Sequence, residues 1–454
     1  MLAVVLAATG LAILALFATS PGLGWLNARN GAILLLLGTF GMGGRPWREL
    51  VRHPIVQLLL LFTIYVVLQA VITHWRMPAI GIDVQLAAAS KPLKLLAWAC
   101  LIGWWLVEHP RWFMPALSLL LLGMAAWTAM HVPWEHFSLI FAGRLRLRPD
   151  DGYAPNLVGL FSALAVLIVT LRLVGDQGRS TRWLVVLWRL MLGLALLLFV
   201  AFLLFAQSRG AWLALLVVLP GSAYWVWRRP GAAVARRRVW PMILIAILFI
   251  AAAGAYLTRP AVWSRFEQGG GIVHALDQGD FAALNTSVGI RLNLYRFGME
   301  KWREAPLTGW GLASIKPMLE RSGIRVRRYI PPHLHDIYLQ TAVGLGGIGL
   351  VLLLLLFTLW LRDLWWACGH DPEHRTQNVI LLGGLSLVLV ANLFDCLLWT
   401  NGYMRMPISL LLAGAMAVSL QRRRALQQAP AYKLKDALYK WISQKIVVSG
   451  LSTK

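Results

Sequence analysis

The sequence alternates between long apolar runs and shorter polar connections along its whole length. A helix needs about 20 apolar residues to cross a hydrocarbon core of about 30 Å. The runs near that length predict spans at residues 1–19, 30–44, 55–73, 93–107, 113–131, 157–174, 183–206, 211–227, 239–258, 337–361, 378–398 and 406–420. The pattern predicts an all-α, polytopic integral membrane protein with about twelve transmembrane helices.

One connection is far longer than the others. Residues 259–336 are polar, and apolar side chains recur every three or four residues between 291 and 305, which predicts a helix there. Pro306–Gly311 has the composition of a turn. We therefore divide the chain into helices 1–9 over residues 1–258, a partly helical loop over 259–336, helices 10–12 over 337–420, and a basic tail over 421–454.

Composition agrees with the membrane class. Charged residues make up only 14% of the chain, and the mean hydropathy is +0.65. The net charge is +24, but Lys and Arg gather in alternate connections, as expected where basic loops stay in the cytoplasm. The charge therefore does not require nucleic acid, and both termini are expected in the cytoplasm. The tail is either a weakly amphipathic segment on anionic lipid or disordered.

Arginines on the opposite face are not explained by this bias. The guanidinium group presents a planar fork of donors suited to phosphate. A group of them could bind the diphosphate of a lipid carrier, namely Arg144, Arg146, Arg148, Arg265 and Arg328. Anchoring to lipid headgroups, or pairing with carboxylates of the long loop, is the alternative for each.

Three further residues could carry chemistry at this membrane surface. Arg209 lies in a tight turn between two apolar spans, where an isolated charge is costly. His335 precedes the tenth span and suits proton abstraction near neutral pH, although an interfacial histidine can be merely hydrogen-bonded. Asp395, near the outer end of the eleventh span, is expected to pair with an arginine or to orient the histidine.

The remaining patterns argue against metal and nucleotide chemistry. The glycines between 344 and 349 are interpreted as helix packing, because small residues let helices approach closely. They do not form a nucleotide loop, because no strand precedes them. No cluster of acidic residues and histidines typical of a divalent metal site is present in the sequence, which favours a mechanism without metal or cofactor.

Several short motifs together resemble the O-antigen ligase family, within the superfamily that includes O-antigen polymerases. His335-Asp336 followed by Gly346 and Gly349 is similar to the family signature, although Asp336 stands where Asn, Ser or Gln is usual. Ser208-Arg209-Gly210 resembles the family's arginine turn, and Arg291 with Pro306–Gly311 resembles its periplasmic loop. Pro155-Asn156 matches a dipeptide that opens a span. The resemblance covers roughly residues 140–400.

This resemblance implies a reaction. The donor is a glycan on undecaprenyl diphosphate, and the acceptor is a sugar hydroxyl of lipid A-core. Transfer takes place at the periplasmic face of the bacterial inner membrane without metal, with inversion at the anomeric carbon. Arg209 and Arg291 would bind the diphosphate and stabilise the leaving group. His335 would take the acceptor proton, and the loop would help to position the two lipid-borne substrates.

Other functions stay open at this point. An O-antigen polymerase would use the same donor with a second lipid-linked glycan as acceptor, and a protein O-oligosaccharyltransferase would use a protein. A lipid-linked-oligosaccharide flippase is expected to show charges along a path through the bilayer and repeat symmetry, neither of which is apparent. A scaffold without catalytic activity is the fourth alternative.

Overall fold

A computed structural model describes residues 2–17, 30–31, 33–35, 47–141, 145–147, 155–175, 182–227, 256, 287–324, 332–397 and 405–428. These residues form α-helices joined by two short 3-10 turns and irregular connections, and no strand occurs among them. The predicted all-α class is therefore confirmed for the part of the chain that the structure describes.

The long helices follow the apolar runs of the sequence. Their bounds are α1 Leu2–Phe17, α4 Pro54–Arg76, α5 Ile82–Glu108, α6 Phe113–Met130, α8 Pro155–Gly175, α9 Arg182–Ala206, α10 Arg209–Trp227, α15 Ile337–His370, α16 Arg375–Ala391 and α18 Arg405–Gln428. Shorter helices are α3 Trp47–Val51, α7 Phe137–Phe141, α13 Ser287–Glu304 and α14 Ile315–Ser322. The helix predicted at residues 291–305 is thus present as α13.

Within these described ranges, 7 helices are long and apolar enough to cross a membrane, and α1 and α16 contain shorter apolar stretches. The predicted span 239–258 lies almost wholly outside the described residues, as does most of 30–44. The count of twelve therefore stays a prediction. One boundary was wrong, because α5 begins at Ile82 and not near residue 93. Its additional turns include buried Gln85, which finds hydrogen-bond partners at Ala313 and Ser314.

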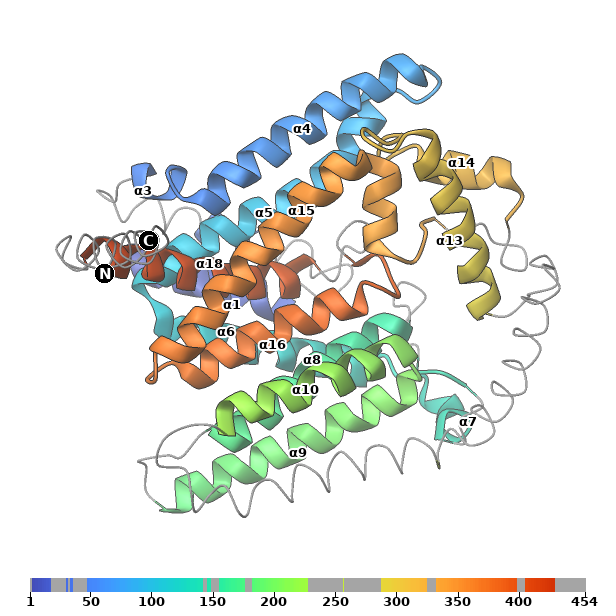
Figure 1. Ribbon diagram of the computed structural model, residues 1–454. Helices are drawn as coiled ribbons and strands as arrows, with labels where there is room; N and C mark the ends of the chain where they lie inside the picture. The colour runs from blue at the N-terminus through green and yellow to red at the C-terminus, as the bar shows by residue number, and fades with distance from the viewer. Residues whose placement is uncertain are drawn as a thin grey trace, which may run out of the picture.

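The helices pack as two groups joined by α16 (Figure 1). In one group α15 lies against α4, α4 against α5, and α5 against α18. In the other, α8 packs against α9 and α10. Helix α8 is buried on all sides from Leu157 to Leu171, so it is a core helix and not a lipid-facing one. Helices α13 and α14 cover the end of the bundle where α15 begins (Figure 1).

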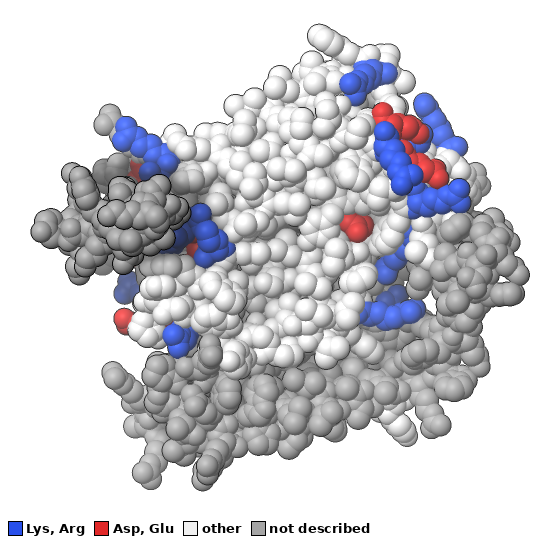
Figure 2. Space-filling model, viewed as in Figure 1, with Lys and Arg blue, Asp and Glu red and all other residues white. Residues whose placement is uncertain are grey.

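Charged side chains gather at two opposite ends of the face seen in Figure 2, with a broad uncharged band between them. This distribution is expected of a protein whose middle lies in hydrocarbon and whose ends lie in water. We call the end that carries α13, α14 and the start of α15 the site end. The opposite end carries α3 and the last turns of α15 and α18.

Three consecutive arginines of α18 hold the opposite end together. Arg422 contacts Asp363 of α15, which is only 3% exposed, and Arg423 donates to the carbonyl oxygen of Arg52. Arg424 donates to both carboxylate oxygens of Glu49 at 2.6 and 2.8 Å and to Glu108 of α5 at 2.6 Å. The run interpreted from sequence as a topology signal therefore also connects α18 to three other elements.

Replacing Arg424 with glutamine should destabilise the protein, because Glu49 and Glu108 would lose their shared counter-charge. These groups are partly exposed, so we expect a cost of about 1–3 kcal/mol, between the values for surface and buried ion pairs. Thermal unfolding of purified protein in detergent measures it. Arg423→Gln is the matched control, and an equal loss in both variants would contradict the special role of Arg424.

Helix α15 is broken at Gly346, where φ is +67° and ψ is −175°. The turn Pro306–Gly311 supplies replacement backbone hydrogen bonds on both sides of the break. Trp310 N–H donates to the carbonyl oxygen of Val343 and Gly311 N–H to that of Gly344, each at 2.8 Å, and Gly347 N–H donates to that of Pro306 at 2.7 Å. The interpretation of these glycines as helix packing was therefore wrong for Gly346, whose conformation is essentially restricted to glycine.

Candidate functional site

The candidate site is built on residues 332–336, the connection that leads into α15. His335 has φ of +57°, a left-handed conformation that is uncommon outside glycine, costs free energy, and persists only where the surroundings enforce it. The next residue begins the helix, because the Asp336 carboxylate accepts from the N–H groups of Tyr338 and Leu339 at 2.8 and 2.9 Å. The acidic residue of the motif thus serves as the N-cap of α15.

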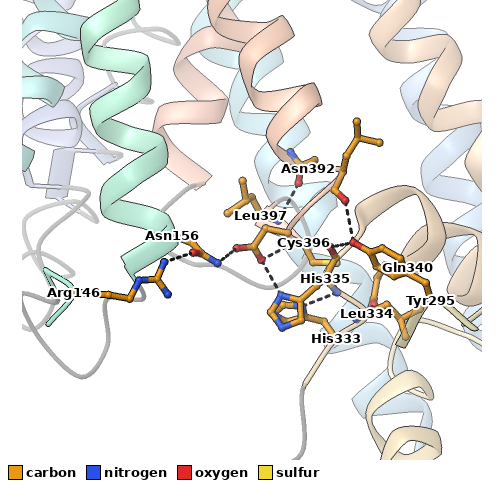
Figure 3. A network of polar contacts seen from close by, with 12 residues as sticks. Arg146, Asn156, Tyr295, His333, Leu334, His335, Gln340, Asn392, Cys396 and Leu397 are labelled. Atoms are coloured by element: carbon orange, nitrogen blue, oxygen red, sulfur yellow. Dashed lines mark hydrogen bonds and ion pairs between the residues drawn. The ribbon is translucent and has the colours of Figure 1, made fainter. Parts of the chain in front are cut away.

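Three contacts hold this strained connection in place. The Tyr295 hydroxyl of α13 lies 3.2 Å from the carbonyl oxygens of both His335 and Leu393. Leu334 N–H donates to the side-chain oxygen of buried Gln340 at 2.9 Å (Figure 3). Ile337 N–H donates to the carbonyl oxygen of Asn392 at 3.0 Å. The backbone around His335 is therefore fixed to α13, α15 and the end of α16.

Asp395 lies beside His335. Its Oδ1 is 3.8 Å from His335 Nδ1, which is close enough for an ion pair but too long for a hydrogen bond, and it accepts from Cys396 N–H at 2.8 Å. Burial opposes ionisation of this carboxyl. The imidazole of His335 and the positive charge that His333 can carry outweigh it and lower the pKa of Asp395 to about 2. Asp395 is therefore a carboxylate throughout the neutral range.

A second contact links Asp395 to a predicted arginine. Asn156, in the first turn of α8, donates to Asp395 Oδ2 at 3.4 Å and accepts from Arg146 Nη2 at the same distance (Figure 3). Arg146 also donates to the carbonyl oxygens of Ala206 and Gln207 at the end of α9, at 3.2 and 2.9 Å. These contacts give Arg146 a structural role at the site, and its contact with substrate stays a prediction.

Arg209 is the first residue of α10, two residues after Gln207, whose φ of +49° marks a tight turn. Its side chain is exposed. The next residue, Gly210, packs against Phe394, because a Cβ atom there would lie 3.1 Å from the Phe394 Cβ. Phe394 adjoins Asp395, so the arginine turn meets the same segment that faces His335. The predicted tight break between these two spans is confirmed.

Arg291 lies in the second turn of α13 and acts electrostatically on His333. Burial lowers the pKa of His333 to about 4, and the positive charges of His335 and Arg291 act in the same direction against the opposing charge of Asp395. The His333 and His335 rings meet edge to face with centroids 4.2 Å apart, and His335 N–H donates to His333 Nδ1 at 3.2 Å. His333 is therefore a neutral hydrogen-bond acceptor at pH 7.

Acidification should destabilise the protein through His333. Its folded pKa of about 4 lies below the unfolded value near 6.5, so the unfolded chain binds more protons between these limits and stability falls as pH falls through this window. From pH 7 to 5 we expect a loss of about 2 kcal/mol from this residue. Thermal unfolding at both pH values measures it, with His333→Asn as the control that keeps an acceptor and cannot titrate. Equal losses in the two proteins would contradict the assignment.

One group of ligand-type side chains occurs in the part of the chain that the structure describes. Ligand atoms of His333, His335 and Asp395 all lie within 4.8 Å of one another. Two imidazoles and a carboxylate are suited to a transition metal ion. Because one nitrogen of His333 already accepts the His335 N–H group, only its Nε2 is available for such an ion. The expectation of a metal-independent mechanism stays a prediction.

Four of the predicted arginines, Arg144, Arg148, Arg265 and Arg328, lie outside the described residues. Of the described candidates, the structure brings His335, Asp395 and Arg146 into one network and places Arg209 and Arg291 on elements that contact it. Sequence reasoning gave no role to Asn156 or to the Tyr295 hydroxyl. Asn156 lies in the first turn of an apolar helix and Tyr295 in the middle of α13, and polar groups at such positions are too common to single them out.

Comparison with known proteins adds the family. Residues 194–354 match the family model described as O-antigen ligase. This match confirms the resemblance to the O-antigen ligase family over that segment. The matched segment contains Arg209, Arg291 and His335, whereas Asn156 and Asp395 lie outside it and join the site only through the fold. A search of curated proteins found no match. The match and the apolar helices together indicate a multi-pass membrane protein, and the match supports a glycosyl-transfer function like that of the O-antigen ligase and polymerase superfamily.

Proposed function

We propose that this protein is an O-antigen ligase. In this proposal it transfers a glycan from undecaprenyl diphosphate to a sugar hydroxyl of lipid A-core, at the periplasmic face of the inner membrane. The observation that carries the proposal is the His335–Asp395 pair, which lies at the end of the bundle beside the Arg209 turn and next to α13, the helix that carries Arg291. A base next to cationic groups is the arrangement that glycosyl transfer from a diphosphate needs.

In the proposed reaction the acceptor oxygen attacks the anomeric carbon of the donor. The bond from that carbon to the diphosphate oxygen breaks, and undecaprenyl diphosphate leaves with the bonding electron pair. His335 takes the proton of the acceptor hydroxyl through Nε2, since its Nδ1 faces Asp395. The carboxylate of Asp395 orients the imidazole and stabilises the imidazolium that forms. Arg209 and Arg291 compensate the negative charge that grows on the leaving group.

The substrates are tested with purified protein in liposomes. A defined glycan on undecaprenyl diphosphate is supplied with lipid A-core, with a second lipid-linked repeat unit, or with an acceptor protein, in buffer containing EDTA. We expect transfer to lipid A-core, and we expect it to survive the chelator. Transfer only to the second lipid-linked glycan would make the protein a polymerase, and transfer only to protein would make it an O-oligosaccharyltransferase. Absence of transfer in all arms would reject the proposal.

A further inference from the structure

Four polar residues form a stripe along one face of α4, a helix that is mostly apolar. Tyr65, Gln69, Thr73 and Arg76 follow one another at spacings of 4, 4 and 3 residues, which places them on one face of the helix. Gln69 and Thr73 are each 1% exposed. Buried polar groups in a membrane helix are costly unless they find partners, so such a stripe indicates contact with something other than lipid.

The partner of the stripe is the Pro306–Gly311 turn. Gln69 Nε2 donates to the carbonyl oxygen of Gly309 at 3.2 Å, and Arg76 donates to the Thr308 hydroxyl at 3.1 Å. A Cβ atom on Gly311 would lie 2.6 Å from Thr73 Oγ1, so the turn backbone rests directly on α4. The Tyr65 hydroxyl donates to the carbonyl oxygen of Leu345, next to the break in α15.

Helix α5 adds a second attachment just beyond the turn. Gln85, which is 1% exposed, donates to the Ser314 hydroxyl at 3.0 Å and accepts from Ala313 N–H at 3.2 Å. Its amide thus uses both a donor and an acceptor on the residues that lead into α14. Gln69 and Gln85 together hold residues 309–314 against the membrane helices from two directions.

The held segment continues to the histidine through one small apolar core. This core consists of Leu294 and Phe297 of α13, Ile315, Met318 and Leu319 of α14, and Leu334 and Val343 next to and within the start of α15. Leu334 is fully buried there and directly precedes His335. Any shift of residues 306–319 relative to α4 and α5 is therefore transmitted to the backbone that carries the imidazole.

We propose that Gln69 and Gln85 are positioning residues, which fix His335 relative to Asp395 by docking the 306–314 segment onto α4 and α5. The inference rests on the proposed function, because it assigns the glutamines a part in the same reaction. Neither side chain reaches the reacting atoms. Leucine would suit the bilayer better at both positions, so a requirement for membrane insertion alone does not explain the two amides.

The test compares Gln69→Leu and Gln85→Leu with the wild-type protein in the reconstituted transfer assay. We expect kcat to fall about tenfold to hundredfold in each variant, the size associated with a misplacement of about 1 Å, while KM for donor and acceptor changes less than about threefold. Gln85→Glu should retain most of the activity, since a buried carboxylic acid stays protonated and keeps one donor and one acceptor.

Matched controls lie on the same helices. Thr63 and Ser90 donate only within their own helices, to Leu59 and Ala87. Thr63→Val and Ser90→Ala therefore remove a polar group from α4 and from α5 without touching the docked segment, and we expect them to have wild-type kcat. Unchanged kcat in the two leucine variants would overturn the proposal, as would a loss confined to KM.

Two further measurements separate positioning from general stability. The double variant Gln85→Leu/Asp395→Asn should lower kcat by less than the product of the two single fold-losses, because both substitutions act through the orientation of His335. A loss equal to the full product would overturn the proposal. Amide hydrogen exchange should rise at residues 306–314 and 332–336 and not in α8. Unchanged exchange there would show that the glutamines do not hold the segment. Transfer retained by His335→Ala would instead reject the proposed function, and the exchange result would still decide the docking.

Discussion

The His335→Ala variant should lose glycan transfer by about a thousandfold or more while remaining folded in the membrane. General-base catalysis contributes about 10²–10⁴ to a rate, and the strained backbone at His335 indicates that the fold is organised to hold this side chain in one place. Asp395→Asn should retain the imidazole but lose the charge beside it, so we expect a smaller loss. Both are measured as initial rates with the diphospholipid donor in liposomes.

The protein contains its own control for this experiment. His374 and Asp371 form a second histidine–aspartate pair, 3.1 Å apart, at the opposite end between α15 and α16. That pair is exposed and lies at the opposite end of the bundle from the site. The His374→Ala variant should therefore transfer glycan at the wild-type rate. Normal transfer by His335→Ala would remove the histidine from the mechanism, and equal losses in both variants would show that the effect is not specific to the site.

The Arg209→Ala and Arg291→Ala variants extend the same prediction to the leaving group. Removing one preorganised donor to a developing negative charge costs about 10²–10³ in kcat. Arg303→Ala is the matched control, because Arg303 lies on α13 with Arg291 but is exposed near the end of that helix. A loss in Arg303→Ala as large as that in Arg291→Ala would indicate a general effect of charge on lipid binding.

The second large effect is expected from Gly346→Ala. At φ of +67° and ψ of −175° a residue with a side chain is strongly disfavoured, and a Cβ atom there would overlap the carbonyl group of Leu307. Strain and overlap together should cost about 3–5 kcal/mol and release the Pro306–Gly311 turn from the break in α15. We expect a lower unfolding temperature together with loss of transfer, since the break lies in the helix that begins just after His335.

Two other glycines of α15 serve as comparisons for this result. A Cβ atom at Gly347 would meet only the carbonyl oxygen of Pro306 at 3.3 Å, so Gly347→Ala should cost little. At Gly369, in the last turn of the same helix, a Cβ atom would have no neighbour within 4 Å, and alanine there should be neutral or slightly stabilising. Similar unfolding temperatures for Gly346→Ala and Gly369→Ala would contradict the role of the break.

The sequence by itself predicted the all-α membrane class, which is supported by the described residues, and it singled out candidate site residues whose roles stay predictions. Apolar runs of membrane-crossing length predicted the long helices, because burial in hydrocarbon imposes that length on every span. It also predicted the helix α13, the turn at 306–311 and the break before Arg209, all of which depend on local spacing and turn chemistry. The family resemblance, carried by Arg209, Arg291 and His335, was confirmed over residues 194–354.

The tertiary structure alone decided which residues meet. Asn156 and Asp395 are 239 positions apart in the sequence and Gln85 and Ser314 are 229 apart, and no local pattern encodes such pairings. Gly346 was interpreted from the sequence as a helix-packing residue. The local pattern could not show the break, because the backbone that docks there comes from Pro306–Gly311, about forty residues earlier. Hydropathy indicates whether each segment prefers water or lipid. The hydrogen-bond partners of buried polar groups, in contrast, are fixed only when distant helices pack against each other.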